Sequence, residues 1–231
     1  MSNYSGTEVT PSIEFVRQLL STGEDGKMLW MTIPPTDVDV EAVAGTGRTA
    51  VNWRTVLVDT DADGSSTALR RTANFYTLGF SNGLEGTVLN WSKQCIFAFR
   101  FQVLTSTTNG VCRVAFGRGS ADGVGDLDDK GIGIVIDNLG LKLQTHNGST
   151  VAEVNPSQTL TVDIVYSMTI TSDGAGNIVW YLDGTSVGTS SGGPTGSSAT
   201  GHNALNIHAS NASDSAAQEM SVHDIRIGLE Q

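Results

Sequence analysis

The sequence is short of positive charge: 13 Lys and Arg residues stand against 24 Asp and Glu residues, a formal net charge of −11. The cationic residues are scattered rather than gathered into one basic run. Such a chain repels a phosphate backbone, so we expect no nucleic-acid partner. Long apolar runs are also missing, because no stretch approaches the ~20 apolar residues that cross a bilayer. We therefore expect no membrane partner, and the first ten residues lack the pattern of a secretory signal.

Cysteine is scarce, with two copies, Cys95 and Cys112. We expect them on successive strands of a hairpin that turns near Thr107. In such a hairpin Cys112 faces about Gln102, several residues along the ladder from Cys95. A disulfide needs Cα atoms within ~7 Å of each other, so a bridge is not expected. Two buried free thiols are predicted, and the fold then does not depend on an oxidising compartment.

Glycine is abundant, with 27 copies, and the Gly, Ser, Thr, Asn and Asp residues are interleaved with short apolar runs. This pattern is typical of many strands joined by turns rather than of a disordered chain. One large domain is a better prediction for 231 residues than two small ones, because all-β domains often exceed the usual domain size.

The clearest predicted strand covers residues 95–103. Its odd positions are all apolar: Cys95, Phe97, Phe99, Phe101 and Val103. Arg100 and Gln102 fall on the other face, and this alternation marks a strand buried on one side. Further strands are expected over residues 53–58, 73–80, 111–116, 132–136, 139–145, 161–171, 178–182, 185–188, 204–209 and 220–229. Their apolar faces need a second sheet, so the sequence predicts an all-β, two-sheet antiparallel jelly-roll sandwich.

The N-terminal region contains the segment with helical spacing. Thr10 can cap it, Pro11 suits the first helical position and Gly23 ends it. Its apolar residues recur at helical intervals: Ile13, Val16, Leu19 and Leu20. We therefore predict that residues 1–50 form an arm or cover with one short helix, and that residues 51–231 form the sandwich.

The last third of the chain resembles a known superfamily. A β-branched run, TLTVDIVYSMTIT, is followed by a DGAGN turn, by IVWYLDGTSVGTS and by the terminal MSVHDIRIGLE. This succession resembles the concanavalin A-like lectin/glucanase superfamily, in particular its laminin-G-like modules, over about residues 95–231. The resemblance implies a jelly roll with a concave face and a rim of loops.

Catalytic patterns are not found. Glucanases of that superfamily carry two Glu residues about four positions apart on one strand, with carboxyl groups ~5 Å apart. The closest Glu residues here, Glu8 and Glu14, lie in the predicted arm. No His or paired-Cys spacing indicates zinc. The sequence therefore predicts a protein that is not an enzyme, although a carboxylate pair from distant strands would escape this test.

One acidic segment begins like a calcium-binding EF-hand loop. Asp59, Asp61 and Asp63 occupy alternate positions before Gly64, so their carboxylates can converge on a hard cation. The twelfth position of that loop requires a bidentate Glu, but this sequence has Arg70 there. An EF-hand is excluded, and a looser calcium loop or a solvated acidic turn remains.

A second acidic segment lies between two predicted strands and contains Asp122, Asp126, Asp128 and Asp129. Many members of the resembled superfamily hold calcium at the rim of the sandwich, so the resemblance implies the same here. Otherwise these carboxylates form a loop whose mutual repulsion water screens. Calcium is the one cofactor that the sequence suggests.

Sugar binding requires an aromatic platform beside polar side chains. Trp180 and Tyr181 point to opposite faces of one strand, and Tyr181 is predicted to face outward because Trp180 shares its parity with apolar neighbours. The polar segment from Asn203 to Asn211 can contribute hydrogen bonds, so Tyr181, Asn203 and Asn211 are the candidate ligand-binding residues. Alternatively, Tyr181 reflects only the preference of tyrosine for strands.

Three functions stay open from the sequence. The first is a noncatalytic virion protein, such as a phage capsid decoration or fibre protein, that contacts a capsid or other virion protein and forms a homo-oligomer such as a trimer. It is expected because a sandwich that is usually exported lacks a signal, and virions assemble in the host cytoplasm. The second is an extracellular carbohydrate-binding lectin that binds a surface glycan, with or without calcium. The third is a polysaccharide-degrading enzyme.

Overall fold

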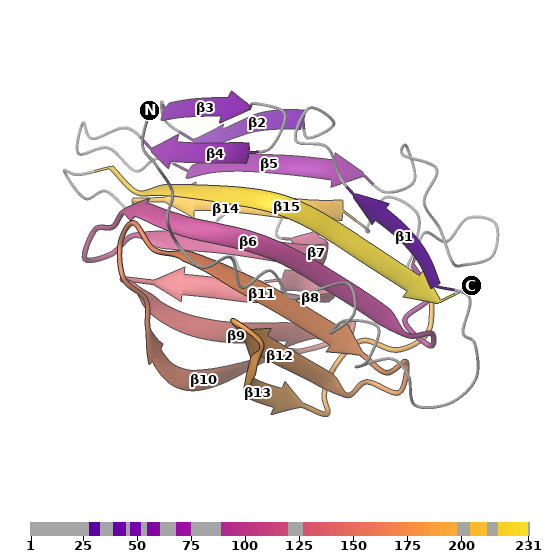
Figure 1. Ribbon diagram of the computed structural model, residues 1–231. Coiled ribbons are helices and arrows are strands. Elements are labelled where there is room, and N and C mark those ends of the chain that lie inside the picture. The colour runs from indigo at the N-terminus through magenta and orange to yellow at the C-terminus, as the bar shows by residue number, and fades with distance from the viewer. Residues whose placement is uncertain are drawn as a thin grey trace.

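The computed structural model is a sandwich of two antiparallel sheets, one behind the other in Figure 1. It describes residues 28–32, 39–44, 47–51, 55–60, 68–74, 89–119, 127–197, 204–211 and 217–230. Within these ranges all fifteen elements are strands, which confirms the all-β prediction. The same ranges contain no helix that is long and apolar enough to cross a membrane.

The larger sheet has eight strands in the order β13-β12-β11-β6-β15-β4-β3, and β1 also pairs with β15. The strands are β1 (Met28–Thr32), β3 (Gly47–Val51), β4 (Thr55–Thr60), β6 (Cys95–Thr105), β11 (Val165–Ser172), β12 (Ile178–Leu182), β13 (Thr185–Ser190) and β15 (Glu219–Glu230). The last strand of the chain therefore lies inside this sheet, between β6 and β4.

The smaller sheet has seven strands in the order β10-β9-β8-β7-β14-β5-β2. The strands are β2 (Asp39–Ala44), β5 (Ala68–Asn74), β7 (Val111–Gly119), β8 (Leu127–Asp137), β9 (Gly140–His146), β10 (Val151–Thr159) and β14 (Ala204–Ser210). Strands β7 to β10 follow one another as neighbours, whereas β14 returns from the C-terminal part of the chain to join β7 and β5.

The region expected to form an N-terminal arm contributes three strands to the sandwich. β1 pairs with β15, β3 pairs with β4, and β2 pairs with β5. The prediction of an arm over all of residues 1–50 is therefore corrected from residue 28 onward. The backbone N–H and C=O groups of these three strands form their hydrogen bonds within the two sheets. The helix expected after Thr10 lies outside the described residues.

Aromatic side chains fill the space between the sheets. The predicted alternation of β6 is confirmed, because its odd residues are buried in the core. Phe97 of β6 stacks on Phe116 of β7, with ring centroids 4.2 Å apart, and so links the two sheets. Trp180 of β12 also reaches across and donates its indole N–H to the carbonyl oxygen of Gly133 at 3.1 Å. Each aromatic pair adds about 0.5–1.5 kcal/mol beyond the burial of its area.

Cys95 and Cys112 are free and buried, as predicted, but the expected hairpin is wrong. β6 and β7 lie in opposite sheets, so they are not hydrogen-bonded to each other. The register instead places Cys112 opposite Ile136 and Ala209. The chain crosses from one layer to the other between the two cysteines, because both strands have one apolar face to bury.

Several strands differ from the sequence prediction. The strand predicted over residues 161–171 begins only at Val165, and the one predicted over residues 132–136 begins earlier, at Leu127. β10 is a strand that the apolar pattern does not predict, because its residues are mostly polar and include Pro156. It lies at the edge of the smaller sheet, and its register shifts between Val154 and Gln158, where a proline is tolerated. The strand predicted over residues 73–80 begins earlier, as β5, and the part beyond Asn74 lies outside the described residues.

Candidate functional site

β15 contains a bulge in the middle of the larger sheet. Its core-facing residues are Met220 and Val222 before the bulge and Ile225, Ile227 and Leu229 after it. The apolar residues thus change from even to odd positions, and the register with β6 shifts between His223 and Arg226. Asp224 accommodates the shift with a positive φ of 49°. An L-residue in this left-handed conformation costs about 1–2 kcal/mol.

The bulge brings four polar side chains together on the outer face of β6 and β15. Asp224 forms an ion pair with Arg100 of β6. His223 lies opposite Arg100 in the register, and its Nε2 atom is 2.9 Å from Oγ of Ser221. We call Arg100, Ser221, His223 and Asp224 the bulge cluster.

The bulge cluster is partly accessible and electrostatically coupled. The side chains of Arg100 and Asp224 are 29% and 34% exposed. A pair at this exposure contributes about 0–1 kcal/mol, which at best offsets the backbone strain at Asp224. Burial lowers the pKa of His223, the positive charge of Arg100 lowers it further, and Asp224 acts in the opposite direction. The imidazole is therefore neutral at neutral pH and can both donate and accept hydrogen bonds.

Tyr181 lies on the same outer face, two strands away from β6. The register pairs Tyr181 with Thr169 on β11, Thr169 with Ala98 on β6, and Ala98 with Arg226 on β15. Adjacent strands lie about 4.8 Å apart, so this row spans about 14 Å across the sheet. Its two inner positions carry small side chains, whereas an aromatic ring and a guanidinium group stand at its ends. We call these four residues the Tyr181 row.

The smaller sheet also has polar residues on its outer face, and several of them are nearly inaccessible. Outward-facing residues of β9 and β14 include Gln144, His146, Asn206 and His208, and their exposed fractions are 2% to 8%. In the Tyr181 row, by contrast, Tyr181, Ala98 and Arg226 are only half-buried, whereas Thr169 between them is buried. The Tyr181 row is therefore more accessible than these four side chains, although Lys142, Asp137 and Glu153 at the edge of the smaller sheet are also partly exposed.

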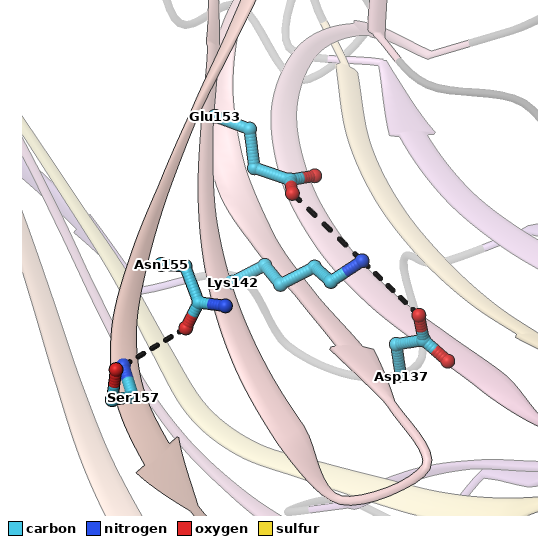
Figure 2. A network of polar contacts seen from close by, with 5 residues as sticks. All are labelled: Asp137, Lys142, Glu153, Asn155 and Ser157. Carbon is cyan, nitrogen blue, oxygen red and sulfur yellow. Dashed lines mark hydrogen bonds and ion pairs between the residues drawn. The ribbon is translucent and has the colours of Figure 1, made fainter.

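An ion-pair network lies at the edge of the smaller sheet (Figure 2). Nζ of Lys142 is 3.1 Å from a carboxylate oxygen of Asp137 and 3.8 Å from one of Glu153. Nearby, the backbone N–H of Ser157 donates to the side-chain oxygen of Asn155 at 2.8 Å. The two carboxylates come from different strands, so sequence spacing could not reveal them. Both are engaged by one ammonium group, whereas the carboxyl pair of a glycosidase flanks the scissile bond.

The structure separates the residues predicted to bind a ligand. Tyr181 is on the outer face and Trp180 is fully buried, which agrees with the predicted parity. Asn211 is also fully buried, at the end of β14 in the other sheet, so it is not brought together with Tyr181. Asn203 lies outside the described residues.

The predicted calcium ligands are only partly covered by the structure. Asp59 lies on β4, opposite Arg48 and Glu219 in the register, and Asp128 is exposed on β8. The other four, Asp61, Asp63, Asp122 and Asp126, lie outside the described residues. Among the residues that the structure does describe, no three His, Cys, Asp or Glu side chains form a group able to hold a metal ion. Calcium binding remains a prediction.

The strands that follow the two acidic segments, β5 and β8, start at opposite ends of the smaller sheet. Ala68 follows the first segment and pairs with Ser210 of β14. Ser210 also pairs with Val111, at one end of β7. Leu127, which follows the second segment, pairs with Gly119 at the other end of β7. Eight residue steps along a strand separate these ends by about 27 Å. The described residues that follow the two segments therefore lie far apart.

One catalytic pattern that the sequence analysis did not recognise is nevertheless present: the Gly-x-Ser-x-Gly spacing of a nucleophile elbow occurs twice, at residues 184–188 and 188–192. Both copies involve β13, the edge strand that pairs with β12. A nucleophile elbow requires a sharp turn from a strand into a helix. Here the first copy passes from a hairpin turn into a strand, and the second passes from the end of that strand into a loop. These serines therefore lack the structural context of a catalytic nucleophile.

Sequence reasoning missed the bulge cluster, although a signal for it is present. The sequence prediction treats residues 220–229 as one strand, yet its apolar residues change parity between Val222 and Ile225. A change of parity within one strand indicates an inserted residue, and bulges often re-aim a side chain beside a functional site. The pattern therefore points to His223 and Asp224. Their partner Arg100 could not be assigned without the strand order.

Sequence comparisons find no relative of this chain: no family model matches it, and no curated protein matches it. Solved structures, however, share its fold. A protein of unknown function from Shewanella oneidensis MR-1 matches with a TM-score of 0.57 and 11% identity, over 99% of this chain and 97% of that one.

Two further structures match at similar levels. An endo-beta-1,4-glucuronan lyase from the fungus Trichoderma reesei has a TM-score of 0.52 and 12% identity, over 89% of this chain and 91% of that one. The binding domain of botulinum neurotoxin DC, in complex with SialylT, has a TM-score of 0.50 and 15% identity. That match covers 82% of this chain but 42% of the toxin chain. At these identities the likeness defines the fold alone, and the chain is a two-sheet antiparallel jelly-roll sandwich.

Proposed function

We propose that this protein binds carbohydrate across the outer face of the larger sheet and does not catalyse a reaction on it. The observation that carries the proposal is the Tyr181 row, with an aromatic ring at one end, small side chains in the middle and Arg226 beside the bulge cluster at the other end. A sugar ring stacks its apolar face on an aromatic side chain and hydrogen-bonds its hydroxyl groups at its rim. The length of the row, about 14 Å, suits a short oligosaccharide.

The bulge cluster supplies the polar half of this surface. Arg100 donates hydrogen bonds, Asp224 accepts them, and the neutral imidazole of His223 does both. The ion pair between Arg100 and Asp224 holds the two side chains in place before a ligand arrives. Groups that are already ordered lose less entropy on binding. This explains why the chain retains a strained residue in a central strand.

The fold supports the proposal in a more general way. Two structures with the same fold are an endo-beta-1,4-glucuronan lyase and a toxin binding domain in complex with SialylT. The two-sheet jelly-roll sandwich is thus a fold on which a carbohydrate-directed enzyme and a binding domain are both built. Fold alone does not decide between them, so the argument rests on the side chains of the site.

Binding without catalysis is favoured by the carboxylates. On the outer faces, Asp224 is paired with Arg100, and Asp137 and Glu153 share Lys142. A glycosidase needs one protonated and one ionised carboxyl group on either side of the scissile bond. The paired carboxylates suit ligand recognition better than proton transfer.

The expected virion role, with its capsid partner and trimeric assembly, remains a prediction from the sequence. The structures described above give it no support. An adhesive virion protein would use a glycan-binding face in the same way, so the proposed activity is compatible with either location.

Binding can be measured with the full chain on a glycan array that contains neutral and acidic oligosaccharides. We expect Tyr181→Ala and Arg226→Ala each to weaken binding roughly tenfold, the effect of losing about 1.4 kcal/mol of contact energy. Lys142→Ala, on the other sheet, is the matched control and should bind like the unmodified chain. The proposal fails if no glycan binds, or if Lys142→Ala weakens binding as much as Tyr181→Ala does.

A further inference from the structure

The turn between β9 and β10 contains an asparagine followed by glycine. Asn147 and Gly148 are both exposed, and Gly148 has a positive φ of 100°. The backbone nitrogen of Gly148 and the side-chain carbon Cγ of Asn147 can close a five-membered ring. A following glycine favours this closure, because it has no Cβ to hinder the approach.

A base lies beside the nitrogen that would attack. The backbone N–H of Gly148 donates a hydrogen bond to Nδ1 of His146, with 3.0 Å between the nitrogen atoms. An imidazole nitrogen that accepts a hydrogen bond carries no proton. His146 is therefore placed to remove the proton of the Gly148 amide, at the distance that general-base catalysis requires.

The carbonyl group that would be attacked is also activated. Oδ1 of Asn147 accepts the backbone N–H groups of Ser149 and Thr150, at 2.8 and 3.0 Å. Two backbone donors on one carbonyl oxygen stabilise the negative charge that develops there when a nucleophile adds to the carbon. The turn thus holds a nucleophile, a base and an oxyanion site around one side-chain amide.

We propose that Asn147 is a self-modifying residue whose side-chain amide nitrogen is lost as ammonia in the folded protein. The Gly148 nitrogen bonds to Cγ of Asn147 while His146 takes its proton, and the negative charge rests on Oδ1. The C–N bond to the side-chain amide then breaks, and the nitrogen leaves as ammonia with the proton that His146 returns. Water opens the resulting succinimide at either carbonyl group, which leaves aspartate or isoaspartate in place of asparagine.

The chain contains its own control for this reaction. Asn109 and Gly110 form the same dipeptide between β6 and β7, and Asn109 is also exposed. The backbone N–H of Gly110, however, donates to the carbonyl oxygen of Thr107 at 3.2 Å. A peptide carbonyl is far too weak a base to take an amide proton. Asn109 therefore has the same Asn-Gly dipeptide without the base, although its Gly110 is buried whereas Gly148 is exposed.

The modification would change the charge at one end of the smaller sheet. Each event replaces a neutral amide by a carboxylate, and the isoaspartate form also lengthens the backbone of the turn. Lys130 and Asp129 lie close by, because a Cβ on Gly148 would meet the Lys130 side chain at 3.2 Å and Oδ1 of Asp129 at 3.5 Å. The new carboxylate therefore has one cationic and one anionic neighbour. None of this depends on glycan binding by the larger sheet.

Peptide mapping by mass spectrometry tests the proposal on the purified full chain, incubated with and without urea. In the native chain, the rate of conversion at Asn147 should exceed the rate at Asn109 by about tenfold or more. This factor is smaller than the rate increase that a positioned base usually gives in an enzyme. In urea the two rates should converge, because the hydrogen bonds of the turn are lost. Equal rates in the native chain, or a faster rate at Asn109, would overturn the proposal.

A variant separates the base from the rest of the turn. His146→Gln keeps a polar side chain but cannot take the proton. The rate at Asn147 should fall by about tenfold or more toward that at Asn109, while the rate at Asn109 stays the same. An unchanged rate at Asn147 in a folded variant would remove His146 from the mechanism. If the variant does not fold, the comparison of native and urea-treated chain decides alone.

Discussion

The side-chain amide of Gln218 donates a hydrogen bond to the thiol of Cys112, with 3.0 Å between Nε2 and Sγ. The other end of the same amide accepts the backbone N–H of Thr107 at 3.0 Å. Gln218 is fully buried, so it fastens the connection between β6 and β7 to the start of β15 from inside the molecule. One side chain thereby joins the two sheets at the end where the chain crosses between them.

Replacing Gln218 by leucine should destabilise the protein. The change leaves the Thr107 N–H buried without its acceptor, which costs about 1–3 kcal/mol. Urea unfolding followed by tryptophan fluorescence measures the loss as a lower midpoint at unchanged slope. The control is Gln158→Leu on edge strand β10, where the amide bonds only to the neighbouring Thr159 and the change should matter little. Equal losses in the two variants would contradict the role assigned to Gln218.

Both cysteines should be inert in the folded protein. Burial raises the pKa of the Cys95 and Cys112 thiols to about 12 each, with a further increase at Cys95 from the charge of Glu230. The reactive thiolate is therefore almost absent at neutral pH, and the sulfur atoms are also sterically shielded. A chromogenic disulfide reagent should label neither thiol in the native chain and both in urea. Rapid stoichiometric labelling of the native chain would show that the core opens easily.

Two substitutions at Asp224 should separate backbone strain from the ion pair. Asp224→Ala loses the pair with Arg100 and keeps the strain, whereas Asp224→Gly loses the pair and relieves the strain. The glycine variant should therefore be more stable than the alanine variant by about 1–2 kcal/mol. Both should bind glycans more weakly than the unmodified chain. If both variants unfold at the same urea concentration, the positive φ of Asp224 stores no strain.

His223 should make stability depend on pH in a defined direction. Its pKa in the folded state is lowered from 6.5, mainly by burial and then by Arg100. As the pH falls below 6.5, the unfolded chain binds a proton at this position before the folded chain does, so the folded state loses stability. Above that pH the contribution is fully present.

The test is urea unfolding of the unmodified chain and of His223→Gln on both sides of pH 6.5. The variant should lose less stability on acidification, because glutamine does not titrate. All other titrating groups are common to the two proteins, so the difference isolates His223. The same loss in both proteins would mean that His223 does not contribute.

Much of the fold could be predicted, because a strand that is buried on one side shows this as an alternation of apolar and polar residues in its own sequence. Alternation over residues 95–103 predicts β6, and the turn at residues 173–177 predicts the hairpin of β11 and β12. β10 could not be predicted in this way. An edge strand with a proline and a register shift buries little, so its sequence carries no apolar period.

In the candidate site, the outward orientation of Tyr181 could be predicted from the sequence, but its neighbours could not. The parity of β12 predicts that Tyr181 faces outward. Thr169, Ala98 and Arg226 become its neighbours only through the order β12-β11-β6-β15, which joins strands that are far apart in the sequence. Tyr181 and Asn211, both predicted to bind a ligand, are not brought together for the same reason, because β14 lies in the other sheet.

The sequence by itself determined which side of each regular strand is apolar, and hence that the chain must form two facing sheets. Only the tertiary structure decided which strands became neighbours, and therefore that Arg100 meets Asp224 and that Tyr181 shares a row with Arg226. The physical reason is that alternation depends on adjacent residues, whereas strand order depends on how all the apolar faces are buried together.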